Sequence, residues 1–268
     1  MMSSSGASKQ RFEISNKYGE KLVGVLHSTG SKNLVILCHG FHASKDDIQF
    51  INIISALTRE GISALHFDFS GNGESEGELK FGDFRKEADD LLAMVLYFSE
   101  KNFKICAICG LSKGGNVVLF YASMHNDAPL IINVSGCFTL KRGLEGRLGK
   151  DFIQRIKKDG FIDVMDKAGK VDYRVNEASL MDYLATDMRA VCLAIDKKCR
   201  ICTVHGSADT DVPLEDAYEF DKSISNHKLH IVEGADHCYL AHLEQLGSSV
   251  VDLIKSAQVL DAPAAPLT

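Results

Sequence analysis

A chain of 268 residues, 45% of them hydrophobic and 25% charged, can bury a sizeable core and fits one α/β domain with a small insertion. The net charge of −6 provides no basic footprint, so we expect no nucleic-acid partner. No apolar run approaches the length of a membrane span, so we also expect no transmembrane segment.

The cysteines and the chain ends bear on metal binding and on the compartment. Two Cys-x-x-Cys pairs, Cys106–Cys109 and Cys199–Cys202, fall at or in predicted strands, where residues three apart point to opposite faces. Zinc sites need converging thiolates, so we expect core cysteines and no metal site. Residues 1–10 lack the apolar stretch of a secretory signal and are expected to form a flexible leader, and residues 259–268 a flexible tail. Reduced thiols without a signal predict a cytoplasmic protein.

Apolar strands alternate with amphipathic helices along most of the chain. The predicted elements are, in order, strands Arg11–Ser15, Lys21–His27 and Leu34–Cys38, helix Ile48–Leu57, strand Ile62–Phe67, helix Phe84–Phe98, strand Ile105–Cys109, a helix after Ser112, strands Leu130–Val134 and Arg200–Val204, a helix after Pro213, strand Leu229–Val232 and a helix from Tyr239 to about Ile254. The first two strands are expected to pair antiparallel. The alternation predicts a mostly parallel eight-stranded sheet with helices on both faces.

One segment between two predicted core strands breaks this alternation. We expect residues 11–137 and 187–258 to form the core, and residues 138–186 to be inserted as a small, mainly helical cap or lid. Its patterns are two polar helices and an extended stretch: Asp151–Lys158, Ile162–Lys167 and Val171–Val175. An insertion at this point is well placed to cover a site at the strand ends.

The insertion carries positive charge in an acidic protein. From Lys141 to Arg174 there are ten Lys and Arg residues against six Asp and Glu. We favour a solvated helical surface as the explanation, and a lid whose charge attracts an anionic substrate is the alternative.

The sequence Gly110-Leu111-Ser112-Lys113-Gly114 lies between the apolar run Ile105–Cys109 and the apolar stretch Val117–Tyr121. This order predicts a strand, a sharp turn and a helix, with a serine at the apex. Small residues are needed at Gly110 and Gly114 because so tight a turn crowds the backbone. The helix directs its first amides at any oxyanion formed there, so Ser112 is a candidate nucleophile.

A serine nucleophile needs a base and an acid that orients the base. Asp209 follows one predicted strand and His237 follows the last, so both reach the sheet edge where α/β proteins gather ligands. The order serine, acid, histidine is the one expected for this kind of scaffold. We predict the triad Ser112, Asp209 and His237, with Asp211 as the alternative acid.

Two backbone amides are expected to bind the oxyanion. One belongs to Lys113, directly after the nucleophile, and the other to Phe41, in the loop after Leu34–Cys38. His39 and His42 in that loop are interpreted as turn and pocket residues, with metal binding as the alternative.

The stretch Phe67–Ser75 contains Gly71-x-Gly73 after a strand, as a nucleotide-binding loop would. The third glycine of that fingerprint and a phosphate-binding basic residue are both missing. We interpret the segment as a loop that braces the site.

Together these residues resemble the α/β-hydrolase superfamily over nearly the whole chain, from the His39–Phe41 loop to Gly234–His237. Within it, the chain is similar to cinnamoyl/feruloyl esterase-like, monoacylglycerol lipase-like and S33 serine aminopeptidase-like hydrolases. The resemblance implies that Ser112, Asp209 and His237 are catalytic, that the Phe41 and Lys113 amides bind the oxyanion, and that the insertion is a cap. Many relatives carry histidine at the position of Leu111 and a neutral residue at that of Lys113.

The expected activity is hydrolysis of carboxylic esters of small molecules through an acyl-enzyme, without a metal or organic cofactor. An aromatic acyl group and an anionic group are the two candidate substrate features. An acyltransferase or lyase on the same scaffold and a non-catalytic ligand receptor are the alternatives. A monomer and a homodimer are both compatible with the sequence.

Overall fold

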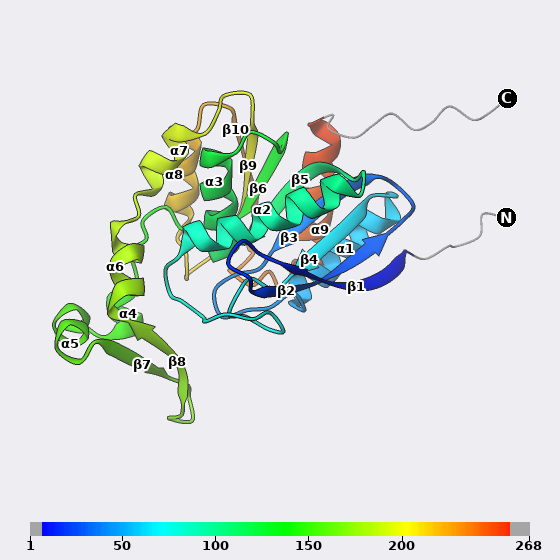
Figure 1. Ribbon diagram of the computed structural model, residues 1–268. Helices are drawn as coiled ribbons and strands as arrows, with labels where there is room; N and C mark the ends of the chain where they lie inside the picture. The colour runs from blue at the N-terminus through cyan, green and yellow to red at the C-terminus, as the bar shows by residue number, and fades with distance from the viewer. Residues whose placement is uncertain (1–6, 258–268) are drawn as a thin grey trace, which may run out of the picture.

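The computed structural model describes residues 7–257 and contains an eight-stranded sheet between two layers of helices (Figure 1). The strands are β1 Ser8–Ser15, β2 Lys21–Ser28, β3 Asn33–Cys38, β4 Ser63–Phe67, β5 Lys104–Leu111, β6 Leu130–Val134, β7 Phe161–Met165, β8 Val171–Asn176, β9 Arg200–Gly206 and β10 His227–Val232. The helices are α1 Ile48–Arg59, α2 Phe84–Glu100, α3 Lys113–Met124, α4 Leu144–Leu148, α5 Phe152–Asp159, α6 Glu177–Ala185, α7 Met188–Ala194, α8 Leu214–Ser223 and α9 Leu243–Ser256.

The sheet order is β1-β2-β4-β3-β5-β6-β9-β10. The pairs β1–β2 and β2–β4 are antiparallel, and all the other neighbours in this sheet are parallel. The predicted mostly parallel eight-stranded sheet is therefore confirmed. Its central strands are continuous apolar runs because helices cover both of their faces.

Two apolar clusters fill the layers on either side of the sheet. Helices α1 and α9 pack on one face, where Phe50 is fully buried. Helices α2, α3, α7 and α8 cover the other face, where Phe98 and Phe220 are buried. Within residues 7–257, no helix combines the length and the apolar character needed to cross a membrane.

Several predicted boundaries are corrected at the ends of the chain. β1 begins at Ser8, inside the expected leader, because residues 8–10 pair with β2. Residues 1–6 of that leader and the expected tail, residues 259–268, lie outside the described residues. The last helix begins at Leu243 instead of Tyr239, whose φ of 54° is not helical. α7 was not predicted, and it begins where the Asp187 side chain accepts hydrogen bonds from two backbone amides.

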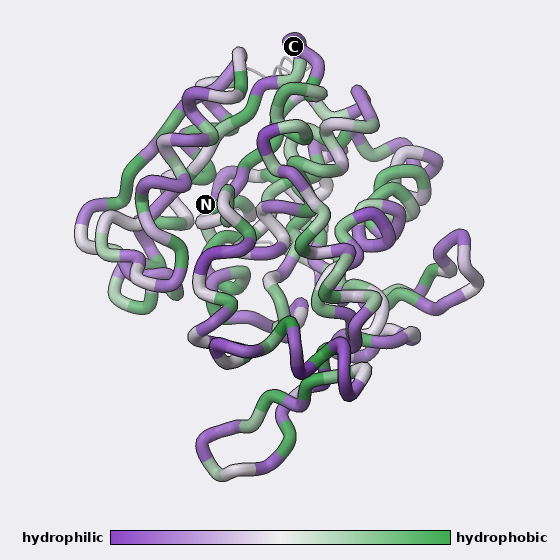
Figure 2. The backbone as a smooth tube through the Cα atoms, turned by 90° about the vertical axis from the view of Figure 1, so that its left-hand side faces the viewer, coloured by the Kyte–Doolittle hydropathy of each residue, from purple (hydrophilic) through white to green (hydrophobic). Residues whose placement is uncertain are grey.

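The insertion extends from one end of the sheet as an arm, and its hairpin projects below the rest of the chain (Figures 1 and 2). It holds α4, α5, the antiparallel pair β7–β8 and α6 around a small apolar cluster of its own. The helix predicted at Ile162–Lys167 is wrong, since Phe161–Met165 is a strand. The turn after it needs Gly169 at φ 77°, and Asp166 Oδ1 accepts hydrogen bonds from two amides there. Helices thus account for most of the regular structure of the insertion, and the hairpin β7–β8 is added to them.

Both Cys-x-x-Cys pairs are buried in or beside core strands, as predicted, and none of the eight cysteines forms a disulfide. The expected placement of Cys106 and Cys109 on opposite faces is wrong, because both belong to the cluster beneath α1 and α9. A register shift opposite Leu34 and Val35 leaves Cys106 as an extra residue in β5. Such a bulge interrupts the alternation of side chains.

The junction of β5 and α3 is packed at backbone contact. A Cβ atom at Gly110 would lie 2.1 Å from the carbonyl oxygen of Gly114. A Cβ atom at Gly114 would lie 2.3 Å from the carbonyl oxygen of Cys38. The predicted need for small residues at both positions is confirmed, and the close approach brings the end of β3 against the start of α3.

We expect Gly114→Ala to lower the free energy of unfolding by about 3 kcal/mol, because the added methyl group meets backbone that cannot move aside. Urea denaturation should show a lower midpoint at an unchanged m-value. Gly146→Ala is the matched control, since a Cβ atom there meets nothing within 4 Å. Equal stability of the two variants would contradict the packing argument.

Candidate active site

Ser112 occupies a backbone conformation that serine rarely adopts. Its φ of 55° and ψ of −119° lie in a region normally left to glycine. The backbone is held there by the hydrogen bond that the Ser112 amide donates to the Val134 carbonyl, 2.7 Å long. The strained apex directs Oγ toward His237, and the distance from Oγ to Nε2 of His237 is 2.9 Å.

His237 and Asp209 extend this contact into a hydrogen-bonded chain. Nδ1 of His237 lies 2.8 Å from Oδ2 of Asp209, whose side chain is fully buried. Oδ1 of Asp209 accepts hydrogen bonds from the amides of Asp211 and Val212. Burial acts to raise the pKa of Asp209, but the hydrogen bond from His237 and these other contacts outweigh it and lower that pKa. The structure thus brings Ser112, His237 and Asp209 together, and Asp211 contributes its amide to Asp209.

His205 lies behind the acid and was not predicted from the sequence. Its Nε2 is 2.8 Å from the Val212 carbonyl oxygen and 3.5 Å from Oδ2 of Asp209. Burial lowers the pKa of His205, which favours a neutral ring. The signal that could have found it is its position: His205 is the second-to-last residue of β9, and Asp209 follows it four residues later.

Phe41 and Lys113 both line one pocket with Ser112 and His237. Lys113 is the first residue of α3, so its amide is one of the unpaired donors at a helix start. The backbone before Phe41 passes close to the serine, since a Cβ atom at Gly40 would lie 3.3 Å from Cβ of Ser112. The two loops predicted to supply amides therefore flank the serine.

The Lys113 side chain turns away from the reacting groups and is buried. Its Nζ lies 2.8 Å from Oε1 of Glu87 and donates to the carbonyl oxygens of Lys80 and Gly82. Burial raises the pKa of Glu87 to about 7, although the Lys113 charge opposes this. The ammonium also lies 5.5 Å from the centre of the Phe41 ring. It fastens the start of α3 to the loop before α2.

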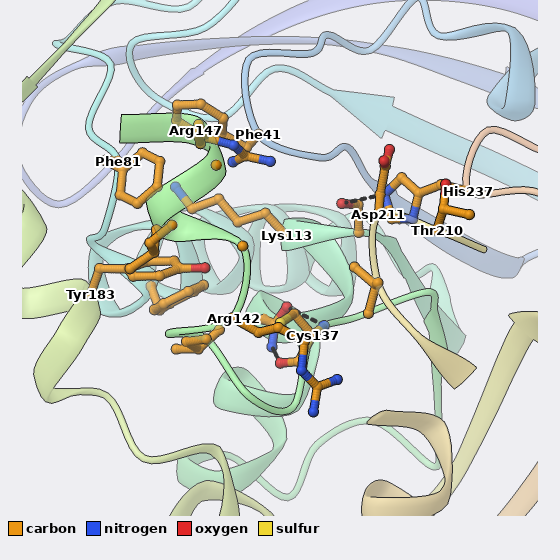
Figure 3. A pocket seen from close by; sticks show the side chains of 18 of the residues that line it. Phe41, Phe81, Lys113, Cys137, Arg142, Arg147, Tyr183, Thr210, Asp211 and His237 are labelled. Atoms are coloured by element: carbon orange, nitrogen blue, oxygen red, sulfur yellow. Dashed lines mark hydrogen bonds between the residues drawn. The ribbon is translucent and has the colours of Figure 1, made fainter. Parts of the chain in front are cut away.

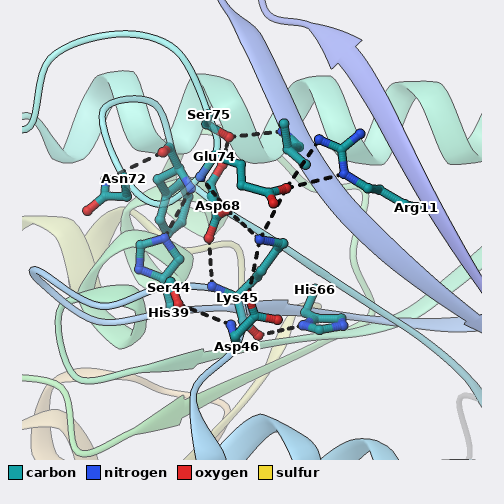
Figure 4. A network of polar contacts seen from close by, with 12 residues as sticks. Arg11, His39, Ser44, Lys45, Asp46, His66, Asp68, Asn72, Glu74 and Ser75 are labelled. Atoms are coloured by element: carbon teal, nitrogen blue, oxygen red, sulfur yellow. Dashed lines mark hydrogen bonds and ion pairs between the residues drawn. The ribbon is translucent and has the colours of Figure 1, made fainter.

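The Gly71-x-Gly73 loop is held by a second buried ion pair (Figure 4). Nζ of Lys45 lies 2.9 Å from Oδ2 of Asp68, a fully buried residue. The same carboxylate accepts hydrogen bonds from the amides of Lys45 and Glu74. Gly73 has no room for a side chain, because a Cβ atom there would lie 2.4 Å from the Asp68 carboxyl group. These contacts join this loop to the segment that follows Phe41.

The two histidines of the His39–Ala43 loop make structural contacts. Nε2 of His39 accepts a hydrogen bond from the Phe69 amide at 3.1 Å, and burial lowers the pKa of His39 to about 4. The ring of His42 lies against Tyr173 in β8. Within residues 7–257, no group of three His, Cys, Asp or Glu side chains is arranged to hold a metal ion.

The pocket encloses about 670 Å³ between the sheet edge and the insertion (Figure 3). Aromatic rings line much of it: Phe41, Phe81, Phe84, Tyr173 and Tyr183. The volume is in the range of sites for small molecules. Ser112 and His237 open onto it, so a bound molecule can reach the hydroxyl group.

The fold is similar to those of several solved structures. Est1E from Butyrivibrio proteoclasticus, with ferulic acid bound, has a TM-score of 0.79 and 24% identity, covering 92% of this chain and 98% of that one. The α/β hydrolase GrgF from Penicillium sp. has a TM-score of 0.78 and 21% identity, covering 94% of this chain and 100% of that one. The Pyrococcus furiosus esterase Pf2001 has a TM-score of 0.72 and 22% identity, covering 93% of each chain. Among curated proteins, none matches this chain.

The sequence also matches a family model, described as serine aminopeptidase, S33, over residues 29–191. This range is more than half of the chain and includes the His39–Ala43 loop and Ser112. The fold neighbours and the sheet topology agree with the match. The chain therefore belongs to the serine aminopeptidase S33 family of the α/β-hydrolase superfamily.

Proposed function

We propose that this hydrolase cleaves carboxylic esters of small molecules through a covalent acyl-enzyme. The observation that carries the proposal is the hydrogen-bonded chain from Ser112 through His237 to Asp209, opening onto a pocket of about 670 Å³. A hydroxyl group, a base within hydrogen-bond reach and a buried carboxylate behind the base are the requirements for a serine nucleophile.

In the proposed mechanism, Oγ of Ser112 attacks the ester carbonyl carbon while Nε2 of His237 takes the hydroxyl proton. The Phe41 and Lys113 amides stabilise the oxyanion, and such donors typically contribute about 3 kcal/mol each. Asp209 holds the imidazole with Nδ1 protonated. His237 then protonates the leaving alkoxide, and water attacks the acyl-enzyme by the same steps.

Small esters suit the shape of the site, and residues 138–186 serve as its cap in this proposal. The aromatic lining favours an apolar or aromatic group beside the ester, a feature shared with the ferulic acid bound to Est1E. The same chemistry would transfer the acyl group to an alcohol if an alcohol took the place of water, so an added alcohol acceptor distinguishes acyl transfer from hydrolysis.

Ser112→Ala should lower kcat/KM for a chromogenic 4-nitrophenyl ester by about 10⁴-fold or more, because it removes the hydroxyl group that lies 2.9 Å from Nε2 of His237. Labelling with a fluorophosphonate, read by mass spectrometry, should be lost in the same variant. Circular dichroism and the melting temperature should match the wild type. Near-normal turnover would refute the nucleophile, and transfer product with added alcohol would favour an acyltransferase.

Asp209→Asn should cost far more activity than Asp211→Asn. The first substitution removes the acceptor that holds the His237 tautomer, and losses of about 10⁴-fold in kcat are typical. The second keeps the backbone amide that Asp211 donates to Asp209. Steady-state kinetics on both variants decides this, and the reverse order would identify Asp211 as the acid.

Lys113→Met should lower the free energy of unfolding by about 3 kcal/mol at pH 8, and by much less at pH 5.5. The substitution strands the buried Glu87 carboxylate, whose pKa of about 7 is already above its usual value of 4.5. A raised carboxyl pKa means that the folded state binds the proton more tightly, so stability falls as pH rises from 4.5 through the folded pKa. Without Lys113 the pKa of Glu87 in the folded state rises further, so the free energy of unfolding keeps falling to a higher pH than in the wild type.

Urea denaturation at the two pH values measures this difference. The double variant Lys113→Met/Glu87→Gln is the control, because it removes the stranded charge and should abolish the pH dependence of the deficit. A Lys113→Met deficit of equal size at both pH values would show that the ion pair does not act in this way.

A further inference from the structure

Three cationic side chains line the pocket, and two of them are already paired with a carboxylate. Lys113 pairs with Glu87 at 2.8 Å, and Arg142 pairs with Asp216 at 2.5 Å. Within residues 7–257, no ion pair joins Arg147 to a carboxylate. The charge of Arg147 is therefore available to a ligand, whereas the other two charges are neutralised by the protein.

The pairing of Arg142 has a structural purpose. The fully buried carboxylate of Asp216, in the first turn of α8, also accepts hydrogen bonds from the amides of Phe138 and Thr139. Asp216 thus holds the first residues of the insertion, and Arg142 compensates its charge. Removing Arg142 would leave a buried carboxylate unneutralised, so its role is in the fold.

Arg147 extends from α4 into the space beside Phe41 (Figure 3). Its charge acts on two phenols of the pocket wall: burial raises the pKa of Tyr173 and of Tyr183, and Arg147 partly opposes the rise in each. Arg147 thus lines the pocket together with Tyr173 and Tyr183, and its side chain is exposed to solvent. A planar cation in such surroundings can bind a carboxylate with two parallel hydrogen bonds.

Among residues 7–257, the acidic residue that lines the pocket is Asp211, on the other side. Asp211 lies next to Thr210 and His237, across the pocket from Arg147 in Figure 3. An anion bound at Arg147 is consequently kept away from Asp211. The leaving alcohol must reach His237 to be protonated, so it lies on the Asp211 side, and the acyl group extends toward Phe41 and Arg147.

We propose that Arg147 binds a carboxylate at the far end of the acyl group, so that the preferred substrates are monoesters of dicarboxylic acids. The inference rests on the proposed esterase function and names its substrate class. Of the positive charges between Lys141 and Arg174, this proposal assigns the one on Arg147 to attraction of an anionic substrate.

The test compares two esters that differ only in charge: mono-4-nitrophenyl adipate and its terminal carboxamide. The wild type should prefer the carboxylate in kcat/KM, and Arg147→Gln should reduce the ratio of the two values by about 10- to 100-fold. Arg147→Lys should give an intermediate ratio, because a lysine keeps the charge without the planar fork. The ratio cancels any general effect of a variant on folding or on the chemical step.

Lys150→Gln is the matched control, since Lys150 is an exposed cation of the insertion that does not line the pocket. Its ratio should equal that of the wild type, and an equal loss in both variants would replace the proposal with a general charge effect. A wild type without preference, or an Arg147→Gln variant that retains it, would overturn the inference while esterase activity stands.

Binding of adipic acid mono-4-nitroanilide, measured by calorimetry, separates the inference from the proposed function. This ligand carries the carboxylate but no ester. It should bind the wild type about 10-fold more tightly than Arg147→Gln, even if no ester is turned over. Equal affinity for the two proteins would overturn the inference whatever the esterase assays show.

Discussion

The left-handed turn at Ser112 is the constraint on which the rest of the site depends. A serine at φ 55° between β5 and α3 holds its hydroxyl group above the sheet edge. The close packing around Gly110 and Gly114 offsets the backbone strain of this conformation. Because Gly114 lies against the Cys38 carbonyl, the turn also sets the position of the loop that follows β3. Both loops proposed to supply oxyanion amides are therefore placed by one local geometry.

Three buried carboxylates secure the loops around that turn, each through a cation. Asp68 with Lys45 holds the loop after β3, Glu87 with Lys113 holds the loop before α2, and Asp216 with Arg142 holds the start of the insertion. Two of the cations belong to the segment that they fasten. Such pairs add little net stability compared with apolar packing, but they fix one arrangement of loops, since breaking either half leaves a buried charge.

The sheet and the hydrogen-bonded residues Ser112, His237 and Asp209 could be predicted from the sequence. The strands have local apolar patterns, and the three residues follow one another in a recognisable order along the chain. Apolar runs such as Leu34–Cys38 have one stable environment, and the strand-end positions of Asp209 and His237 follow from parallel topology. The strand Phe161–Met165 could not be predicted, because its polar pattern is compatible with a helix and the strand forms only by pairing with β8. His205 and the partners of Lys113 were missed for a related reason: their roles depend on contacts between distant segments.

The charged residues of the insertion also depend on contacts that the sequence does not specify. Ten cations and six anions between residues 141 and 174 say nothing of which charges face a ligand. Their ion pairs do: Arg174 binds Asp163 across the hairpin, Arg142 binds Asp216, and Arg147 is left facing the pocket. The groups proposed for catalysis lie on sheet-edge loops, whereas Arg147 lies on the insertion. In this arrangement, a substitution in the insertion can alter substrate choice without disturbing the turn at Ser112.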